Sequence, residues 1–115
     1  MDVETTAHKR CSVVTVSGRV DSNTAPKFEE ALKKVIEGHK ETKAQKNVVL
    51  ELSGVEFMSS AGLRGMVSSL KACKSGGGDL RLATPSARVV EVMQLAGLTS
   101  LFQVFDDKTA AVGSF

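Results

Sequence analysis

Residues Val48 to Arg64 read VVLELSGVEFMSSAGLR, a strand pattern that leads directly into a helix pattern. The apolar run at 48–50 predicts a strand that is buried on both faces, as in the middle of a sheet. Residues 59–62 (SSAG) then form a small, hydroxyl-rich turn, and a helical pattern follows directly. A helix start stabilises negative charge, so the turn is typical of an exposed corner suited to a regulatory contact or a phosphoacceptor.

On the N-terminal side of this stretch, two strand patterns precede a helical one. Alternating β-branched residues predict a strand over Cys11–Ser17, broken at residues 18–21, and a weaker strand pattern occupies Val3–Thr6. Pro26 suits the first turn of the helix and Gly38 its end. The candidate N-caps are Ser22, Asn23 and Thr24. The predicted inward face consists of Phe28, Ala31, Leu32, Val35 and Ile36.

On the C-terminal side, a second helix is predicted from the turn to Cys73, because apolar residues recur there at helical spacing. Three successive glycines, Gly76–Gly78, stop this helix. A clean alternation then predicts a strand over Asp79–Ala83, and Thr84–Pro85 is the predicted cap of a third helix. The residues predicted to face inward on that helix are Val89, Val92, Met93 and Leu95.

The last part of the chain repeats the same alternation. Gly97 ends the third helix, a short strand is predicted over Leu101–Phe105, and Asp106–Asp107 opens a final helix toward Ala111 and Val112. Strand and helix therefore alternate throughout, which predicts a single α/β domain over residues 1–115 with a mostly parallel sheet. Residues 1–10 are expected to be partly disordered or to form a short edge strand.

Composition and charge exclude several classes of protein. The net charge is +2, Tyr and Trp are absent, and the five Phe are the only aromatic residues, so a stacking platform for nucleic acid is not expected. The polar segment from His39 to Asn47 is predicted to be a loop or a frayed helix, and the short basic run at 40–46 within it, which contains Glu41, is interpreted as a solvated loop. The chain has no leader-like segment and no stretch long enough to span a bilayer, so we expect a cytoplasmic protein without direct membrane insertion.

Enzyme and metal chemistry have little support in the sequence. His8 and His39 are the only histidines, and neither lies beside a strand end that carries a nucleophile, so no hydrolytic triad is expected. The three glycines follow a helix and precede a strand, which is the wrong order for a phosphate-binding loop. Cys11 and Cys73 are interpreted as buried free thiols. We therefore expect a binding module without catalytic residues, metal or cofactor.

Several strings together resemble the STAS-domain family, the anti-sigma factor antagonists of bacterial partner-switching pathways. The resemblance runs from about Cys11 to Phe105. The strings that carry it are SGRVD at 17–21, ELSGV at 51–55, FMSSAGLR at 57–64, GG at 77–78, Pro85, and LAGL at 95–98. The resemblance implies a small α/β domain with four or five strands and about four helices, packed mainly on one side of the sheet.

The resemblance also implies a function. Free-standing members of the family bind a serine-kinase anti-sigma factor and thereby release a sigma factor. The kinase phosphorylates the antagonist at the turn, which breaks the complex, and a phosphatase reverses the modification. The residues that the resemblance places at the partner contact are Asp21, Ser59, Ser60, Ala61, Gly62, Leu63 and Arg64.

The turn departs from the family pattern at the position that matters most. The family's usual phosphoacceptor directly precedes the glycine, and here that residue is Ala61. Ser59 stands where the family has aspartate, and Glu51 replaces another usual aspartate. Two interpretations follow: Ser60 or Ser59 has become the acceptor, or phosphorylation is lost and the domain is a constitutive binder, a scaffold or a transport-associated subunit. The two retained hydroxyls favour a switch at Ser60.

Overall fold

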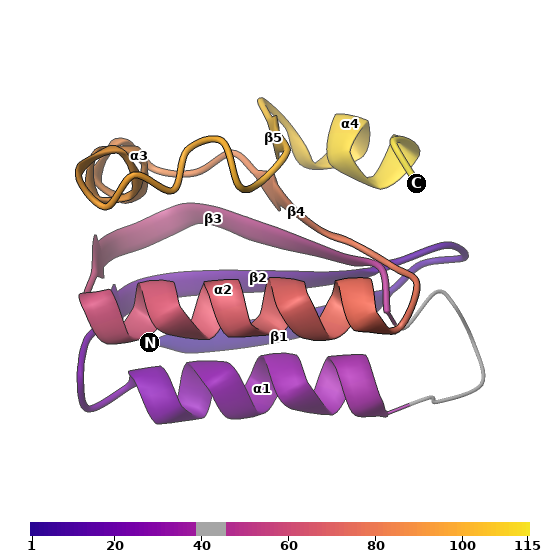
Figure 1. Ribbon diagram of the computed structural model, residues 1–115, viewed down its shortest axis with the longest axis horizontal. Coiled ribbons are helices and arrows are strands. Elements are labelled where there is room, and N and C mark those ends of the chain that lie inside the picture. The colour runs from indigo at the N-terminus through magenta and orange to yellow at the C-terminus, as the bar shows by residue number, and fades with distance from the viewer. Residues whose placement is uncertain (39–45) are drawn as a thin grey trace.

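The computed structural model describes residues 1–38 and 46–115, which form a five-stranded sheet and four helices (Figure 1). The strands are β1 (Asp2–Ala7), β2 (Ser12–Val20), β3 (Val48–Met58), β4 (Leu80–Ala83) and β5 (Val104–Phe105). The helices are α1 (Ala25–Glu37), α2 (Ser60–Ser75), α3 (Ala87–Leu95) and α4 (Lys108–Gly113). His39 and most of the predicted loop and basic run that follow it lie outside the described residues.

The sheet follows the order of the sequence. Strand β1 pairs with β2 in the antiparallel direction, and β2, β3, β4 and β5 are parallel to their neighbours. Each parallel connection crosses over through a helix, as parallel strands require. The predicted α/β class and the mostly parallel sheet are confirmed, and the weak pattern near Val3 is a genuine edge strand, β1.

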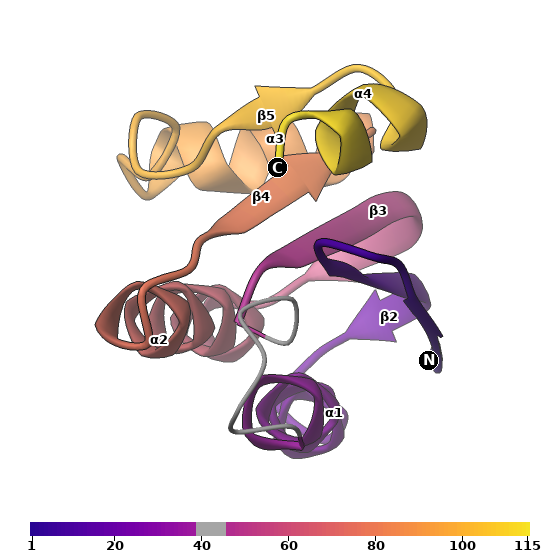
Figure 2. The ribbon, with the colours of Figure 1, turned by 90° about the vertical axis from the view of Figure 1, so that its right-hand side faces the viewer.

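Alternate residues of the inner strands supply two apolar clusters on opposite faces of the sheet. The larger cluster takes Val14, Leu50 and Leu82 from three neighbouring strands, together with buried side chains of α1, α2 and α3. The smaller cluster takes Val13 and Val49 and is completed by Ala111, Val112 and other side chains near α4. Helices α1 and α2 therefore share one side of the sheet while α4 covers the other (Figure 2).

The central strand is longer than the sequence pattern predicts. Strand β3 continues through Ser53 and Gly54 to Met58, because two irregularities in its pairing with β2, at Thr15/Ser17 and at Gly18/Arg19, each absorb one extra residue. The carboxylate of Glu51 accepts the N–H of Ser53 at 2.6 Å, which satisfies a backbone donor within this irregular segment. Strand β2 likewise continues to Val20, so the expected break at Gly18 is wrong.

The predicted cap of α3 and one predicted core residue are wrong, and the predicted cap of α1 is right in position only. Thr24 is the N-cap residue of α1 but makes no side-chain cap bond, since its hydroxyl accepts the N–H of Asp21 and donates to the carbonyl of Arg19. Helix α3 is capped by Ser86, and Thr84 has a positive φ of 47° that lies outside any helix. Leu95 is 82% exposed, because it lies two residues beyond the buried Met93 and therefore on nearly the opposite side of α3.

Within the described ranges, no helix has the length and apolar character needed to cross a membrane. The same ranges contain no group of three His, Cys, Asp or Glu residues placed to hold a metal ion.

Candidate functional site

The candidate site is a corner at the carboxyl ends of the two central parallel strands. Val20 and Met58 are paired as the last residues of β2 and β3. The N–H of Ser59 donates to the carbonyl of Val20 at 2.8 Å. The loop that begins with Asp21 and the turn that begins with Ser59 therefore lie side by side, although they are far apart in the sequence. We call residues 59–62 the β3–α2 corner.

Ser59 is the N-cap of α2. Its backbone is extended (φ −84°, ψ 169°), and its hydroxyl oxygen accepts the N–H of Gly62 at 3.2 Å. Its carbonyl accepts the N–H of Leu63 at 3.0 Å. The side chain thus satisfies one of the helix's unpaired first donors, which is the usual work of an N-cap serine. The predicted helix start beside Ser59 is confirmed, with Ser60 as the first helical residue.

Ser60 differs from Ser59 in both exposure and bonding. It is exposed, and among residues 1–38 and 46–115 its hydroxyl has no hydrogen-bond partner. The hydroxyl therefore contributes nothing visible to the fold. It lies at the positive end of the helix dipole, where an added negative charge is stabilised.

The residues that follow Ser60 are buried or half-buried, and they hold the β3–α2 corner against the sheet. Gly62 is buried, and a Cβ added there would contact the Met58 sulfur and lie 2.8 Å from Cγ1 of Val20. Only a glycine lets the start of α2 approach the sheet this closely. Leu63 is 5% exposed within the larger core cluster, and Ala61 is half-buried.

Asp21 holds the neighbouring loop in place. Its Oδ1 accepts the N–H groups of Asn23 at 2.9 Å and Thr24 at 3.0 Å, together with the Thr24 hydroxyl at 3.2 Å. These bonds favour the ionised carboxyl, so they lower its pKa, with the Thr24 N–H as the largest cause and Arg19 as a minor one. In the described part of the chain Oδ2 accepts no hydrogen bond, and it remains available to a partner.

A shallow apolar groove of about 610 Å³ begins at Ser60 and runs between α2 and the segment after α3. We call it the Ser60 groove. Leu63, Val67, Ala96 and Leu98 supply its apolar wall. Its polar lining residues are Glu29, Ser60, Arg64, Ser68 and Lys71.

Sequence reasoning identified Ser60, Leu63 and Arg64 but missed the rest of this groove. The string at 95–98 carries part of the family resemblance, but the spacing predicts Leu95 to be buried. The chain turns after α3 at Gly97, where φ is 71°, so Leu98 lines the groove while Leu95 stays exposed on α3.

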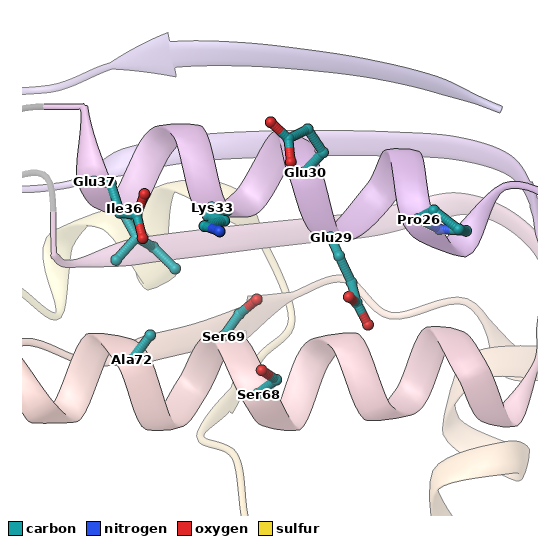
Figure 3. A pocket seen from close by; sticks show the side chains of 9 residues that line it. All are labelled: Pro26, Glu29, Glu30, Lys33, Ile36, Glu37, Ser68, Ser69 and Ala72. Atoms are coloured by element: carbon teal, nitrogen blue, oxygen red, sulfur yellow. The ribbon is translucent and has the colours of Figure 1, made fainter.

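A second groove, of about 480 Å³, lies between α1 and α2 (Figure 3). Ser69 points from α2 toward α1 across it, and Glu29 extends from α1 toward α2 (Figure 3). Glu29 lines this groove and the Ser60 groove, so the two adjoin. Neither groove is lined by a histidine in the part of the chain that the structure describes.

Comparisons with known proteins agree on the family. The STAS domain model matches residues 2–111. The chain is 30% identical over 103 residues to BtrV of Bordetella bronchiseptica, provisionally named an anti-sigma factor antagonist, covering 90% of this chain and 84% of that protein. It is 28% identical over 104 residues to the anti-sigma-B factor antagonist of Staphylococcus aureus, covering 90% and 92% of the two chains.

A solved structure supports the same assignment. The crystal structure of an anti-sigma factor antagonist from Mycobacterium paratuberculosis has a TM-score of 0.84 to this chain at 26% identity, covering 98% of this chain and 92% of that one. The sequence match, the sheet order and the strand-to-helix corner all lead to one assignment. This chain belongs to the STAS domain family.

Proposed function

We propose that this protein is an anti-sigma factor antagonist that binds a serine-kinase anti-sigma factor through the β3–α2 corner and the Ser60 groove. The names of its relatives support the general role. The observation that carries the proposal is Ser60, an exposed hydroxyl without a structural partner among the described residues, at the mouth of an apolar groove. Apolar surface beside an exposed hydroxyl suits a protein contact better than a small-molecule site.

Ser60 is the proposed phosphoacceptor. Ala61 has no hydroxyl, and the hydroxyl of Ser59 already accepts the N–H of Gly62. Phosphorylation of Ser59 would require breaking the N-cap of α2, whereas Ser60 can react without loss of a structural bond. The kinase would transfer the γ-phosphoryl group of ATP to the Ser60 oxygen and release ADP, and a cognate phosphatase would hydrolyse the ester.

A phosphate on Ser60 would be tolerated by the fold and rejected by the partner. The N-terminus of α2 stabilises negative charge, and Arg64 lies one helical turn farther on, at the spacing for an ion pair. The free protein would therefore remain folded. In the complex, the phosphate's charge of nearly two units would have to be desolvated against the apolar wall of the Ser60 groove, which disrupts the contact.

Asp21 supplies the second part of the proposed contact. Its loop is fixed by hydrogen bonds through Oδ1, and Oδ2 accepts no hydrogen bond among the described residues. Because the Asp21 loop and the β3–α2 corner are joined by the Ser59–Val20 bond, one partner can contact both. A cationic group of the partner opposite Asp21 would add orientation and association rate more than affinity.

The proposal is tested with purified serine-kinase anti-sigma factors encoded in the same genome. Each is mixed with this protein, binding is measured by calorimetry, and the products formed with ATP are mapped by peptide mass spectrometry. We expect one kinase to bind and to add a single phosphate to Ser60. The modification should be absent in Ser60→Ala and present in Ser59→Ala.

Two results contradict parts of the proposal. A kinase that binds but leaves both serines unmodified would eliminate the switch and favour a non-phosphorylated scaffold. A protein that binds none of these kinases, but co-purifies with a transporter subunit, would instead favour the transport-associated role.

A further inference from the structure

The free edge of the sheet provides a second interaction surface, separate from the Ser60 groove. Strand β1 is the first in the sheet order and pairs with β2 on one side only. Within residues 1–38 and 46–115 no strand covers its other side. An open strand edge presents unpaired main-chain donors and acceptors, which makes it a template for another strand.

The register of β1 shows which backbone groups point outward. The N–H of His8 donates to the carbonyl of Cys11 at 2.8 Å, so His8 faces β2. In an antiparallel pair the bonded residues alternate, so Thr6, Glu4 and Asp2 also direct their backbone groups toward β2. The backbone groups of Val3, Thr5 and Ala7 therefore point away from the sheet.

The same three residues line a groove of about 550 Å³ between β1 and α1. Their side chains share it with Ala31 and Val35 of α1, and Lys27 and Lys34 also line it. A strand added to the edge of β1 would direct every second side chain into this groove. Small apolar residues would cover Ala31 and Val35 there.

The charges along β1 favour a second copy of this chain as that strand. Asp2 and Glu4 are acidic at the start of β1, and His8, Lys9 and Arg10 follow its end. Antiparallel pairing of two identical strands places the acidic start of each beside the basic end of the other. Opposite charges across neighbouring strands stabilise the pair, and the parallel arrangement would bring like charges together.

We propose that two copies of this protein associate through their β1 edges, antiparallel and about a two-fold axis at Thr5. Val3 of one copy then pairs with Ala7 of the other, and all three outward residues of each strand are hydrogen-bonded. This register places Asp2 opposite His8 of the second copy. The sheets become continuous across the two copies. The β3–α2 corner stays accessible, because it lies on the central strands and not on this edge.

Hydrogen exchange and sedimentation of the wild-type protein test the proposal. From about 10 µM to about 1 mM, the mass should rise from one chain toward two. The amides of Val3, Thr5 and Ala7 should gain protection over the same range, while those of Glu4 and Thr6 are protected throughout. A single chain at every concentration, or a dimer in which these three amides exchange freely, would overturn the proposal.

Matched variants at the centre of the contact make the test specific. Thr5→Pro removes an N–H that points outward in both copies, and an edge position tolerates proline. The association should weaken at least about tenfold, whereas Thr5→Val, which keeps the N–H, should dimerise as the wild type does. Asp2→Lys should also weaken the dimer, and His8→Asp in the same chain should restore it. Equal association in Thr5→Pro and Thr5→Val would place the contact elsewhere and refute the β1 edge. Pairing that requires an extended segment of another protein would refute the second copy as occupant.

Discussion

Two corners of this molecule have the same construction and different surfaces. The β3–α2 corner and the turn from β4 into α3 both follow a parallel strand, and each begins its helix with a serine N-cap. Ser59 accepts the N–H of Gly62 at 3.2 Å, and Ser86 accepts the N–H of Val89 at 3.3 Å. At the next position the first corner exposes a serine, Ser60, and the second exposes an alanine, Ala87.

The serines at the two corners differ in whether the fold uses their hydroxyls. Ser86 also donates its hydroxyl to the carbonyl of Val55 at 2.7 Å, so its side chain is fully used by the fold. Ser60 makes no such bond in the described chain, although it sits at an equivalent helix start. A capping serine explains why such a corner forms. It does not explain a second, exposed hydroxyl beside it, and that residue is where function is expected.

The largest expected effect comes from placing a negative charge on each corner. Ser60→Glu should lower affinity for the anti-sigma factor by about a hundredfold, or about 2.8 kcal/mol, because the carboxylate would be desolvated in the contact. Ala87→Glu places the same charge at the matching position of α3 and should leave affinity unchanged. Calorimetry with the partner kinase measures both. Equal losses at the two corners would show that net charge, not the Ser60 groove, controls binding.

Removal of the capping serines should affect the second corner more than the first. Ser86→Ala should lower the free energy of unfolding by about 2 kcal/mol, because it removes a cap and leaves the Val55 carbonyl without its donor. Ser59→Ala should cost about 1 kcal/mol, since only the cap is lost. Urea unfolding of the two variants measures the difference. If Ser59→Ala proved the more damaging, the hydroxyl of Ser59 would have a structural role beyond the cap.

Much of the fold could be predicted from the sequence, and each wrong prediction has a local cause. The apolar run 48–50 correctly indicated a strand buried on both faces, since all three side chains are fully buried. Ser53 and Gly54 resemble a turn, but a Cβ on Gly54 would lie 2.9 Å from Cβ of Ser17. The glycine is there because two strands approach closely at an irregularity, and one strand's sequence does not reveal its neighbour.

The candidate site could be predicted only in part, because it too depends on contacts between segments that are distant in the sequence. Hydroxyls at a helix start follow from the sequence, and so does the proposed importance of Ser60. Which serine is engaged as a cap depends on one hydrogen bond, and the groove depends on the turn at Gly97 after α3. The sequence pattern groups Leu95 with Val89 and Met93 because all three are apolar, but Leu95 lies on nearly the opposite side of α3 from Met93.

A third difference between the corners lies two residues beyond the exposed position. Gly62 of α2 corresponds there to Val89 of α3, so α2 approaches the sheet without a side chain between them. Gly62→Ala should lower the free energy of unfolding by about 1 kcal/mol, because crowding against Val20 outweighs the gain in helix propensity. Gly113→Ala, where an added Cβ meets nothing within 4 Å, is the matched control and should not destabilise. Equal unfolding midpoints in urea would show that the corner can relax.

The loop beside the first corner should add a pH dependence that the second corner lacks. The Thr24 N–H lowers the pKa of Asp21, so the unfolded chain binds this proton more tightly than the folded chain. The stabilisation is complete above the ordinary carboxyl pKa of about 4 and is lost as the pH falls through the lower, folded pKa. Asp21→Asn should flatten the acid side of the stability profile. Parallel profiles for the two proteins, from urea midpoints at several pH values, would contradict this.

The smallest expected effect concerns stability without a partner. Ser60→Asp places a charge at the start of α2, with Arg64 one turn farther on, and should stabilise the free protein by about 0.5 kcal/mol. Ala87→Asp places the same charge at the start of α3. There Glu91 occupies the position that corresponds to Arg64, and its repulsion offsets the gain. Thermal unfolding at low salt should separate the two variants, and about 1 M salt should remove the difference by screening. If both variants were stabilised equally, Arg64 would have no part in accommodating a phosphate, and the helix terminus alone would have to hold it.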